Sequence, residues 1–184
     1  MPPAVAPPPE RSLGIWAVVA MLAEGEAHGW ALVRRLAPGG DVGEVWSIRR
    51  ALVYRTVEQA VSAGLIEHAG LVPGERGSPR TLLRITPAGR RAVRRWLDEP
   101  VASVRDLRSA LLLKLLFAQR AGHDPTPLLL SQREILGAIV ARLEAPLPPD
   151  AERDTRTIRA FRLETARAGL RFVEGELSAI GGAS

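Results

Sequence analysis

The sequence contains no cysteine, only one lysine and few aromatic residues. The absence of cysteine excludes disulfide bonds, thiolate zinc sites and cysteine nucleophiles. No apolar run approaches the roughly 18 uncharged residues that a membrane-spanning helix needs. The first nine residues, MPPAVAPPP, lack the basic start and the continuous apolar core of a secretory signal. We therefore expect a cytoplasmic protein without a membrane segment, and a disordered proline-rich tail over residues 1–11.

The sequence also lacks the motifs of catalysis and of metal binding. Its three histidines, His28, His68 and His123, are far apart, and none belongs to a cluster at ligand spacing. Neither a GxSxG motif nor a phosphate-binding glycine loop is present. Neighbouring acidic residues such as Glu24 and Glu26 fall in an expected turn without a partner base. We therefore expect no catalytic residue, no metal and no cofactor, in a protein that is not an enzyme.

Positive charge is concentrated in one segment of the chain. Residues 47–96 hold ten arginines and three acidic residues, whereas the whole chain carries a net charge of +5. The rest of the chain is therefore slightly acidic in total. A positive field that is confined to one compact segment suits a polyanion such as duplex DNA.

Hydrophobic spacing, capping residues and turn residues predict the order of elements in the first half of the chain. The expected elements are helices over 13–25, 28–36 and 47–63, strands over 65–72 and 81–86, and a helix over 87–97. Ser47 is the expected N-cap of the third helix, which turns Ala51, Tyr54, either Val57 or Glu58, and Val61 inward. Three helices followed by a hairpin and another helix are typical of a winged helix-turn-helix domain.

Arginines at the start of the third helix and at the hairpin tip are the candidate DNA contacts. They are Arg49, Arg50 and Arg55 in the helix, and Arg76 and Arg80 in the hairpin. Recognition helices contact base edges with their N-terminal residues, and arginine can bind guanine through two hydrogen bonds. Arginines of a wing lie along the DNA backbone or in the minor groove. His28 is a further candidate because free N–H groups at a helix start favour a phosphate. The alternative for each cluster is a charged surface that is only solvated.

Residues 99–184 have a different character, with 12 basic and 11 acidic side chains. Helices are expected over 105–119 and 126–145. A third helix is indicated by apolar residues that repeat with the alternating spacing of a coiled-coil seam. An exposed stripe of this kind would form a large apolar patch, so we expect a second copy of the chain to cover it. The candidate dimer-interface residues are Leu111, Leu115, Ile158, Phe161, Ala168 and Phe172.

Several local motifs resemble the PadR family of bacterial transcriptional regulators. They lie in LAEGEAHGWALVRRL (22–36), WSIRRALVYRTVEQAVSAGLIE (46–67) and RTLLRITPAGRRAVRRWL (80–97). The matches are Gly29–Trp30, Val53–Tyr54, the Gly-Leu-Ile step at 64–66, the Thr-Pro-Ala-Gly step at 86–89, and Trp96. The family commonly has small polar residues where this chain has Arg49 and Leu52.

The resemblance implies roles for several aromatic side chains. Trp30 and Tyr54 match positions of the family's DNA-binding segment, where the tyrosine ring packs inside and its hydroxyl reaches a phosphate. Effectors of the family are often flat aromatic or amphipathic compounds that bind between the winged helix and the C-terminal helices. Trp16 and Trp96 are the candidate residues of such an effector pocket.

The expected fold class is mainly α with a small β-hairpin wing. It comprises a winged helix-turn-helix DNA-binding domain over 12–98 and a C-terminal helical dimerisation region over 99–184. We expect a homodimeric repressor that binds a pseudo-palindromic operator in bacterial DNA and is released by a small-molecule effector. Two alternatives stay open. One is a regulator without a ligand that a protein partner controls, and the other is a winged-helix module that binds an acidic protein.

Overall fold

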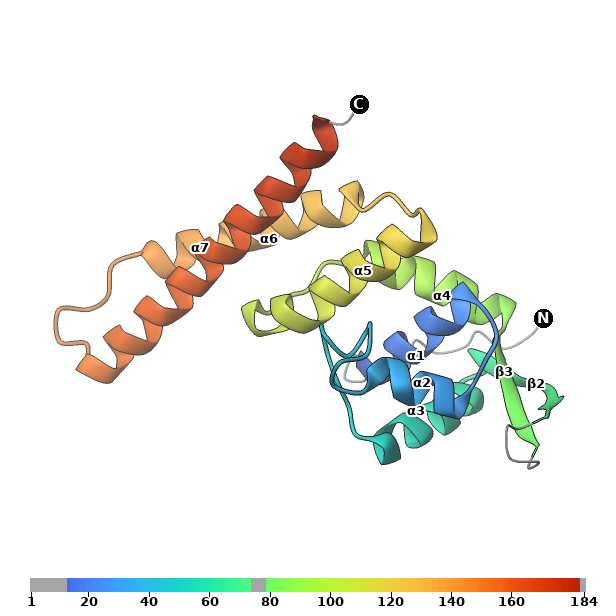
Figure 1. The fold of residues 1–184 in the computed structure, drawn as a ribbon. Helices are drawn as coiled ribbons and strands as arrows, with labels where there is room; N and C mark the ends of the chain where they lie inside the picture. The colour runs from blue at the N-terminus through green and yellow to red at the C-terminus, as the bar shows by residue number, and fades with distance from the viewer. Residues whose placement is uncertain (1–12, 74–78, 183–184) are drawn as a thin grey trace, which may run out of the picture. The chain divides into compact units, whose positions relative to one another are not determined.

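The structure is a computed structural model, and it describes residues 13–73 and 79–182 (Figure 1). The first elements are α1 (Leu13–Glu24), β1 (Ala27–His28), α2 (Gly29–Leu36), α3 (Arg50–Ser62), β2 (Ile66–Val72), β3 (Arg80–Ile85) and α4 (Pro87–Asp98). A 3-10 turn (Val104–Asp106), a π-helical turn (Leu107–Leu111), α5 (Leu112–Ala121), α6 (Thr126–Glu144) and α7 (Arg153–Gly181) follow. The predicted class, mainly α with a small β-hairpin, is confirmed. None of the described helices combines the length and the apolar character needed to span a membrane. The expected tail over 1–11 and Arg76 lie outside the described residues.

The chain forms two compact units that are not continuous in sequence. Unit 1 comprises the chain up to Leu97 together with Leu112–His123, and unit 2 comprises Asp98–Leu111 and the chain from Asp124 onwards. Helix α5 therefore belongs to the same unit as α1 to α4. The functional division of the chain near residue 98 stays a prediction.

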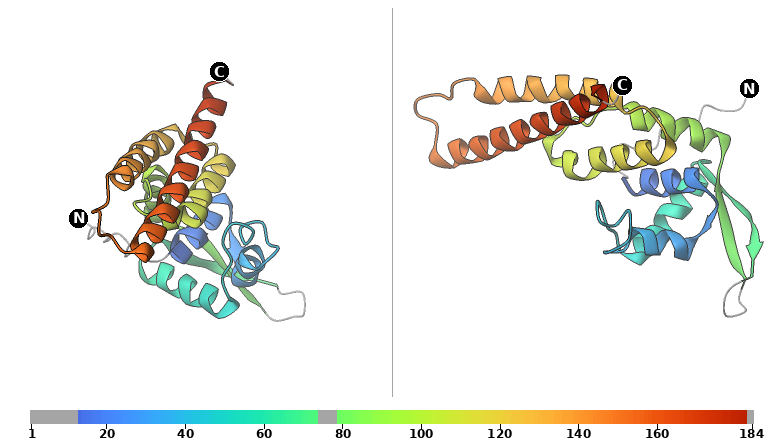
Figure 2. Two further views of the ribbon diagram at one scale, coloured as in Figure 1. Left: turned by 90° about the vertical axis from the view of Figure 1, so that its left-hand side faces the viewer. Right: turned by 45° about the horizontal axis from the view of Figure 1, so that its top comes forward.

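A three-stranded antiparallel sheet gives unit 1 its wing. The strand order is β1-β3-β2, so β3 pairs with both neighbours. In the hairpin, Ile66 lies opposite Ile85 and Val72 lies opposite Arg80, with an irregularity between His68 and Gly70. Together with α1, α2 and α3, this hairpin makes a winged helix-turn-helix (Figures 1 and 2). Strand β1 has no signal in the sequence, because two residues are too few to show an alternating pattern.

The core of unit 1 is built around α1, which lies between α3 and α4 (Figures 1 and 2). Eight of the twelve residues of α1 are buried. The core also contains apolar side chains from every other helix of the unit, including Leu32, Leu36, Val53, Val57, Trp96, Leu113 and Phe117. Because Leu113 and Phe117 come from α5, the core of the winged helix is incomplete without that helix.

Helix α3 begins later than predicted, and Ser47 does not cap it. The N-cap residue is Arg49, whose side chain makes no capping hydrogen bond. The backbone N–H of Ile48 donates to the carbonyl of Leu36 at 3.1 Å, at the end of α2. This bond ties the segment to α2, so helical hydrogen bonding starts only after it.

The later start changes which side chains of α3 face the core. The buried residues are Val53, Thr56, Val57 and Ala60. The prediction that Ala51 and Tyr54 point inward is therefore wrong, since both side chains are exposed. Thr56 instead packs against Gly14 of α1, where an added Cβ would lie 3.0 Å from the threonine Oγ1.

In unit 2, α6 and α7 form an antiparallel pair (Figure 2). Gly169 of α7 lies close to Leu136 of α6, and Arg159 donates to carbonyl groups at the end of α6. The buried amide of Gln132 binds both backbone groups of Val101, at 2.8 and 3.0 Å. The single helix predicted over 105–119 is wrong, because the chain passes through 3-10 and π-helical turns before α5 begins.

Candidate nucleic-acid interface

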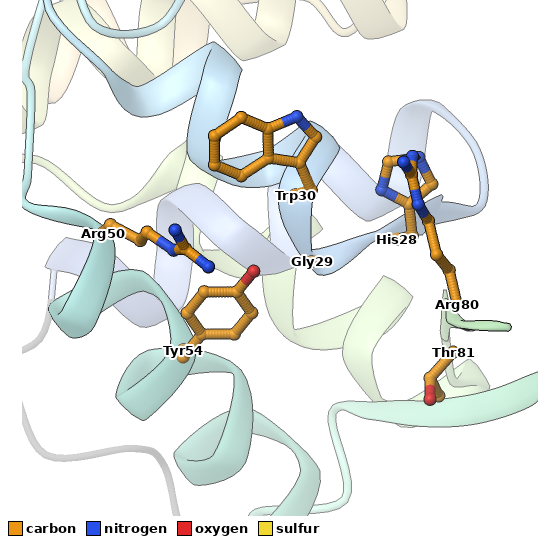
Figure 3. A pocket seen from close by; sticks show the side chains of 7 residues that line it. All are labelled: His28, Gly29, Trp30, Arg50, Tyr54, Arg80 and Thr81. Carbon is orange, nitrogen blue, oxygen red and sulfur yellow. The ribbon is translucent and has the colours of Figure 1, made fainter. Parts of the chain in front are cut away.

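A pocket of about 570 Å³ lies on unit 1 where α2, α3 and β3 meet (Figure 3). Its lining residues are His28, Gly29, Trp30, Arg50, Tyr54, Arg80 and Thr81. Five of them are predicted DNA contacts, and the fold brings them together from three segments. Sequence reasoning misses Gly29 and Thr81. The pairing of Gly29 with Trp30 in the family motif is a signal for the first, and we find none for Thr81.

His28 joins the start of α2 to the wing. As the N-cap of α2, its Nδ1 accepts a hydrogen bond from the N–H of Ala31 at 3.1 Å. Its Nε2 lies 3.3 Å from Nη1 of Arg80. Because β1 pairs with β3 and places His28 opposite Leu82, the strand register itself brings the histidine near Arg80.

The two contacts of His28 together determine which nitrogen of its imidazole ring carries the proton. A neutral imidazole accepts a hydrogen bond at one nitrogen only, and the other nitrogen carries the proton. When Nδ1 accepts from Ala31, Nε2 is therefore a donor that faces a second donor, the guanidinium of Arg80. A phosphate oxygen can accept from both groups, so this corner of the pocket suits an anion.

Arg50 is held between two aromatic rings at the mouth of the pocket. Its guanidinium carbon lies 5.2 Å from the centroid of the Trp30 ring and 5.7 Å from that of Tyr54. Figure 3 shows the guanidinium directed toward the tyrosine ring. The two rings are 42% and 37% exposed, so the charge is presented to solvent and is also restrained by cation–π contacts.

Gly29 allows the tyrosine ring to lie against the first turn of α2. A Cβ at this position would lie 2.8 Å from Cε1 of Tyr54, closer than real Cβ contacts come. The glycine therefore permits a close approach between the first turn of α2 and the ring of Tyr54. The Tyr54 ring that lies in this space is one of the two rings in contact with Arg50.

The exposed face of α3 carries further positive charge. Arg49 and Arg55 are exposed, and Arg55 projects from the side opposite the buried row. Among the described residues, no carboxylate pairs with Arg49, Arg50 or Arg55. Ser47 is exposed in the preceding loop and does not line the pocket.

Other arginines of unit 1 are neutralised by acids. Arg84 of the wing lies 2.6 Å from Glu67, which raises the pKa of its guanidinium through a hydrogen bond and charge. Arg35 contacts Glu24 at 2.6 Å and Asp41 at 2.8 Å, and Arg120 of α5 contacts Asp41 at 2.8 Å. Asp41 lies in the loop between α2 and α3, so this network ties α5 to the segment that leads into α3.

Trp16 and Trp96, the candidate effector residues, stack on each other. Their centroids are 5.5 Å apart and their planes differ by 8°. Nζ of Lys114 lies 4.3 Å from the Trp96 ring centroid and donates to the Trp96 carbonyl at the end of α4. Neither tryptophan lines the pocket of Figure 3. Their role with an effector stays a prediction.

The candidate interface residues fall into two groups. Ile158, Phe161, Ala168 and Phe172 are all exposed on α7, and we call them the α7 stripe. Phe161 is 74% exposed. The buried residues of α7, Ala166 and Val173, lie on the other side of the helix. Leu115 is half-buried in unit 1, whereas Leu111 is fully buried in unit 2 and not accessible to a partner in this conformation.

No family model and no curated protein match the chain. The chain is, however, similar to solved structures. A crystal structure of Bacillus subtilis PadR in complex with operator DNA is similar with a TM-score of 0.47 and 17% identity, over 92% of this chain and 99% of that chain. The structure of Bacillus subtilis PadR in complex with p-coumaric acid gives 0.40 and 17%, over 90% of this chain and 97% of that one. A further Bacillus subtilis PadR structure gives 0.41 and 18%, over 96% and 98%. The chain is thus similar to structures from the family that its motifs resemble.

Proposed function

We propose that this protein is a transcriptional regulator that binds duplex DNA in a sequence-specific manner through α3 and the wing. The observation that carries the proposal is the pocket, where Arg50 of α3, Arg80 of the wing and the imidazole of His28 share one surface. Phosphates are acceptors for these donor groups, and α3 has the dimensions of a helix that enters the major groove.

The residues of this surface divide by their expected contacts. Arg55 projects farthest from the buried row of α3, so it is the proposed base-reading residue. Arg49 and Arg50 precede it at the start of the helix. Arg50, Arg80, His28 and the hydroxyl of Tyr54 are the proposed phosphate contacts, with Trp30 restraining Arg50. Phosphate contacts fix the position of the protein on DNA, and base contacts provide specificity.

We further propose a homodimer that forms through the α7 stripe. An apolar row of this length is unusual on the surface of a monomer, and a second copy can cover it with the same row. Two recognition helices related by a two-fold axis would bind a pseudo-palindromic operator, with half-sites about one helical turn apart.

The proposed mode of action is repression in the bacterial cytoplasm, relieved by a small aromatic effector. An effector that binds at Trp16 and Trp96 would have to separate two rings that are stacked at 5.5 Å, or bind at the partly exposed Trp16 alone. A regulator without a ligand, controlled by a protein partner, is the alternative that requires no such rearrangement.

The experiment that tests the proposal is selection from a pool of random duplexes with the purified protein, followed by footprinting on the region upstream of its own gene. We expect an enriched motif with two-fold symmetry and a protected site that contains it. Arg133→Ala, a change at an exposed arginine of unit 2, should leave the motif unchanged. Equal binding to every duplex, or binding only to acidic polypeptides, would contradict the proposal and favour the protein-interaction module.

A further inference from the structure

Helix α4 carries a second surface of positive charge. Arg90, Arg91, Arg94 and Arg95 are all exposed, and we call them the α4 stripe. Their spacing places them side by side along one face of the helix. The opposite face is apolar and consists of the buried residues Gly89, Ala92, Val93, Trp96 and Leu97. The segregation of charge on α4 is therefore complete between Arg90 and Leu97.

The charges of the α4 stripe are not compensated within the described residues. No carboxylate of the described chain pairs with any of the four arginines. By contrast, Arg35, Arg84, Arg120 and Arg167 each contact at least one acidic side chain. A solvated helix face usually mixes both signs of charge, whereas this one carries a single acid, Asp98, at the C-terminal end of α4.

Helix α4 packs closely against the rest of unit 1. A Cβ at Gly89 would lie 2.1 Å from the carbonyl oxygen of Leu65, so the helix start lies directly against the backbone at the base of the wing. Near its other end, Trp96 stacks on Trp16 of α1. Helix α1 lies between α4 and α3 (Figures 1 and 2), and the α4 stripe is on the face of α4 opposite its buried side chains, so the stripe is separate from the exposed face of α3.

We infer that the α4 stripe is a second DNA-binding surface, which contacts the phosphate backbone of a second duplex or of a distant segment of the same one. Four charges span five residue steps, about 7.5 Å of helix. This density is close to that of duplex DNA, which carries one phosphate per about 1.7 Å of its axis. The stripe holds no aromatic or large apolar side chain that could anchor a protein partner, whereas backbone binding requires only positive charge.

The number of duplexes bound per chain tests this inference, and it does not depend on whether α3 reads sequence. The probe is a random-sequence duplex of about 12 base pairs, little more than one helical turn, at low salt. Sedimentation with detection of protein and DNA absorbance gives the stoichiometry. We expect two duplexes per chain for the unaltered protein, and one for the variant with Arg90, Arg91, Arg94 and Arg95 all changed to Gln. Affinity for the second duplex should fall with the third to fourth power of the salt concentration, roughly as expected for four phosphate contacts.

Three comparison variants distinguish DNA binding at the α4 stripe from a general effect of net charge. Arg→Lys at the same four positions keeps the charge and should restore two duplexes per chain. Arg→Gln at Arg105, Arg133, Arg142 and Arg153, all exposed in unit 2, removes the same charge and should leave two. Arg→Gln at Arg49, Arg50 and Arg55 should leave one duplex, bound at α4.

Several results would overturn the inference. One duplex per chain for the unaltered protein would show that α4 binds no DNA. An equal loss in the unit 2 variant would assign the effect to net charge alone. Binding of polyglutamate in place of duplex, or loss of dimerisation when the four arginines become Gln, would identify the α4 stripe as a protein contact.

Discussion

At the residue scale, the geometry of the pocket depends on Gly29, which has no side chain. Gly29→Ala would place a Cβ 2.8 Å from the ring of Tyr54. Because this ring is partly exposed, we expect it to move outward, which removes one of the two aromatic contacts of Arg50. DNA affinity should fall by about tenfold, or about 1.4 kcal/mol, while the fold stays intact. Fluorescence anisotropy with an operator duplex measures the change.

Gly137→Ala is the matched control for this substitution. Gly137 lies in α6, and a Cβ there would meet nothing within 4 Å. Alanine also favours a helix more than glycine does, so the control should be neutral or slightly stabilising. Unchanged DNA affinity in Gly29→Ala would show that the position of Tyr54 does not matter for binding.

Asp41 gives a prediction about pH. The hydrogen bond from Arg35 holds the pKa of Asp41 below its ordinary value of 3.8, and Arg120 acts in the same direction. A carboxyl whose pKa is lowered by folding stabilises the native state above its ordinary pKa, and this contribution is lost as the pH falls through the lowered value. Asp41→Asn should therefore reduce the free energy of unfolding at neutral pH, by at most about 1 kcal/mol for such a solvent-exposed pair.

Urea denaturation as a function of pH measures this effect. The difference between the unaltered protein and Asp41→Asn should begin to shrink as the pH falls below about 4, and it should vanish once the pH has fallen through the lowered pKa of Asp41. Glu58→Gln, at an exposed position of α3, should show no comparable difference at neutral pH, because Glu58 contacts no basic side chain of the described residues. A difference for Asp41→Asn that persists unchanged in acid would mean that the ion pairs with Arg35 and Arg120 contribute nothing.

At the scale of elements, α5 decides whether the winged helix is stable. Phe117 of α5 is 3% exposed and belongs to the core of unit 1. Phe117→Ala in the full chain should lower the free energy of unfolding by about 3–5 kcal/mol, because it removes a buried aromatic ring and leaves a cavity.

Tryptophan fluorescence during urea denaturation reports this change, since all four tryptophans lie in unit 1. Leu71→Ala, at an exposed position of the wing, should change stability by less than about 0.5 kcal/mol. A loss for Phe117→Ala as small as that for Leu71→Ala would show that residues up to 98 carry a sufficient core by themselves.

The elements that sequence reasoning locates well are those with a regular apolar period and a clear end. Helix α4 follows Thr86, which accepts from the Gly89 N–H, and its apolar and basic faces are sharply separated. Helix α3 is located less well. Its apolar residues occur on several sides, and its start depends on the bond from Ile48 to Leu36, which no local pattern reveals. The π-helical turn at Leu107–Leu111 likewise has no signal in the sequence.

The same holds for the candidate site, where the kinds of residue follow from the sequence but their arrangement in space does not. The residue types of the pocket could be predicted, because arginines and a histidine at a helix start suit phosphate. Their geometry could not. The contact between His28 and Arg80 depends on pairing between β1 and β3, and the exposure of Tyr54 depends on where α3 begins.

At the scale of the whole molecule, the proposed dimer can be tested at Phe161. This side chain is exposed in the single chain, so Phe161→Asp should not unfold the monomer. It would place a charge without a partner in the proposed interface, at a cost of several kcal/mol to association. We expect a monomer in sedimentation and much weaker operator binding, because two linked DNA-binding units gain from effective concentration.

Ala160→Asp is the control for this prediction. It introduces the same charge at the preceding exposed residue, away from the α7 stripe. The control should remain a dimer with unchanged operator affinity. If Phe161→Asp also remains a dimer, the α7 stripe is not the interface between copies.

The central claim is that the exposed face of α3 reads DNA sequence, and Arg55 tests it most directly. The measurement is the affinity of Arg55→Ala for the selected operator and for a random duplex at one salt concentration. We expect a loss of about 1–3 kcal/mol on the operator and a much smaller loss on the random duplex, so the specificity ratio falls. Arg80→Ala should weaken binding to both duplexes alike and lower the salt dependence by about one unit. An equal loss on operator and random duplex for Arg55→Ala, or no loss on either, would contradict the claim.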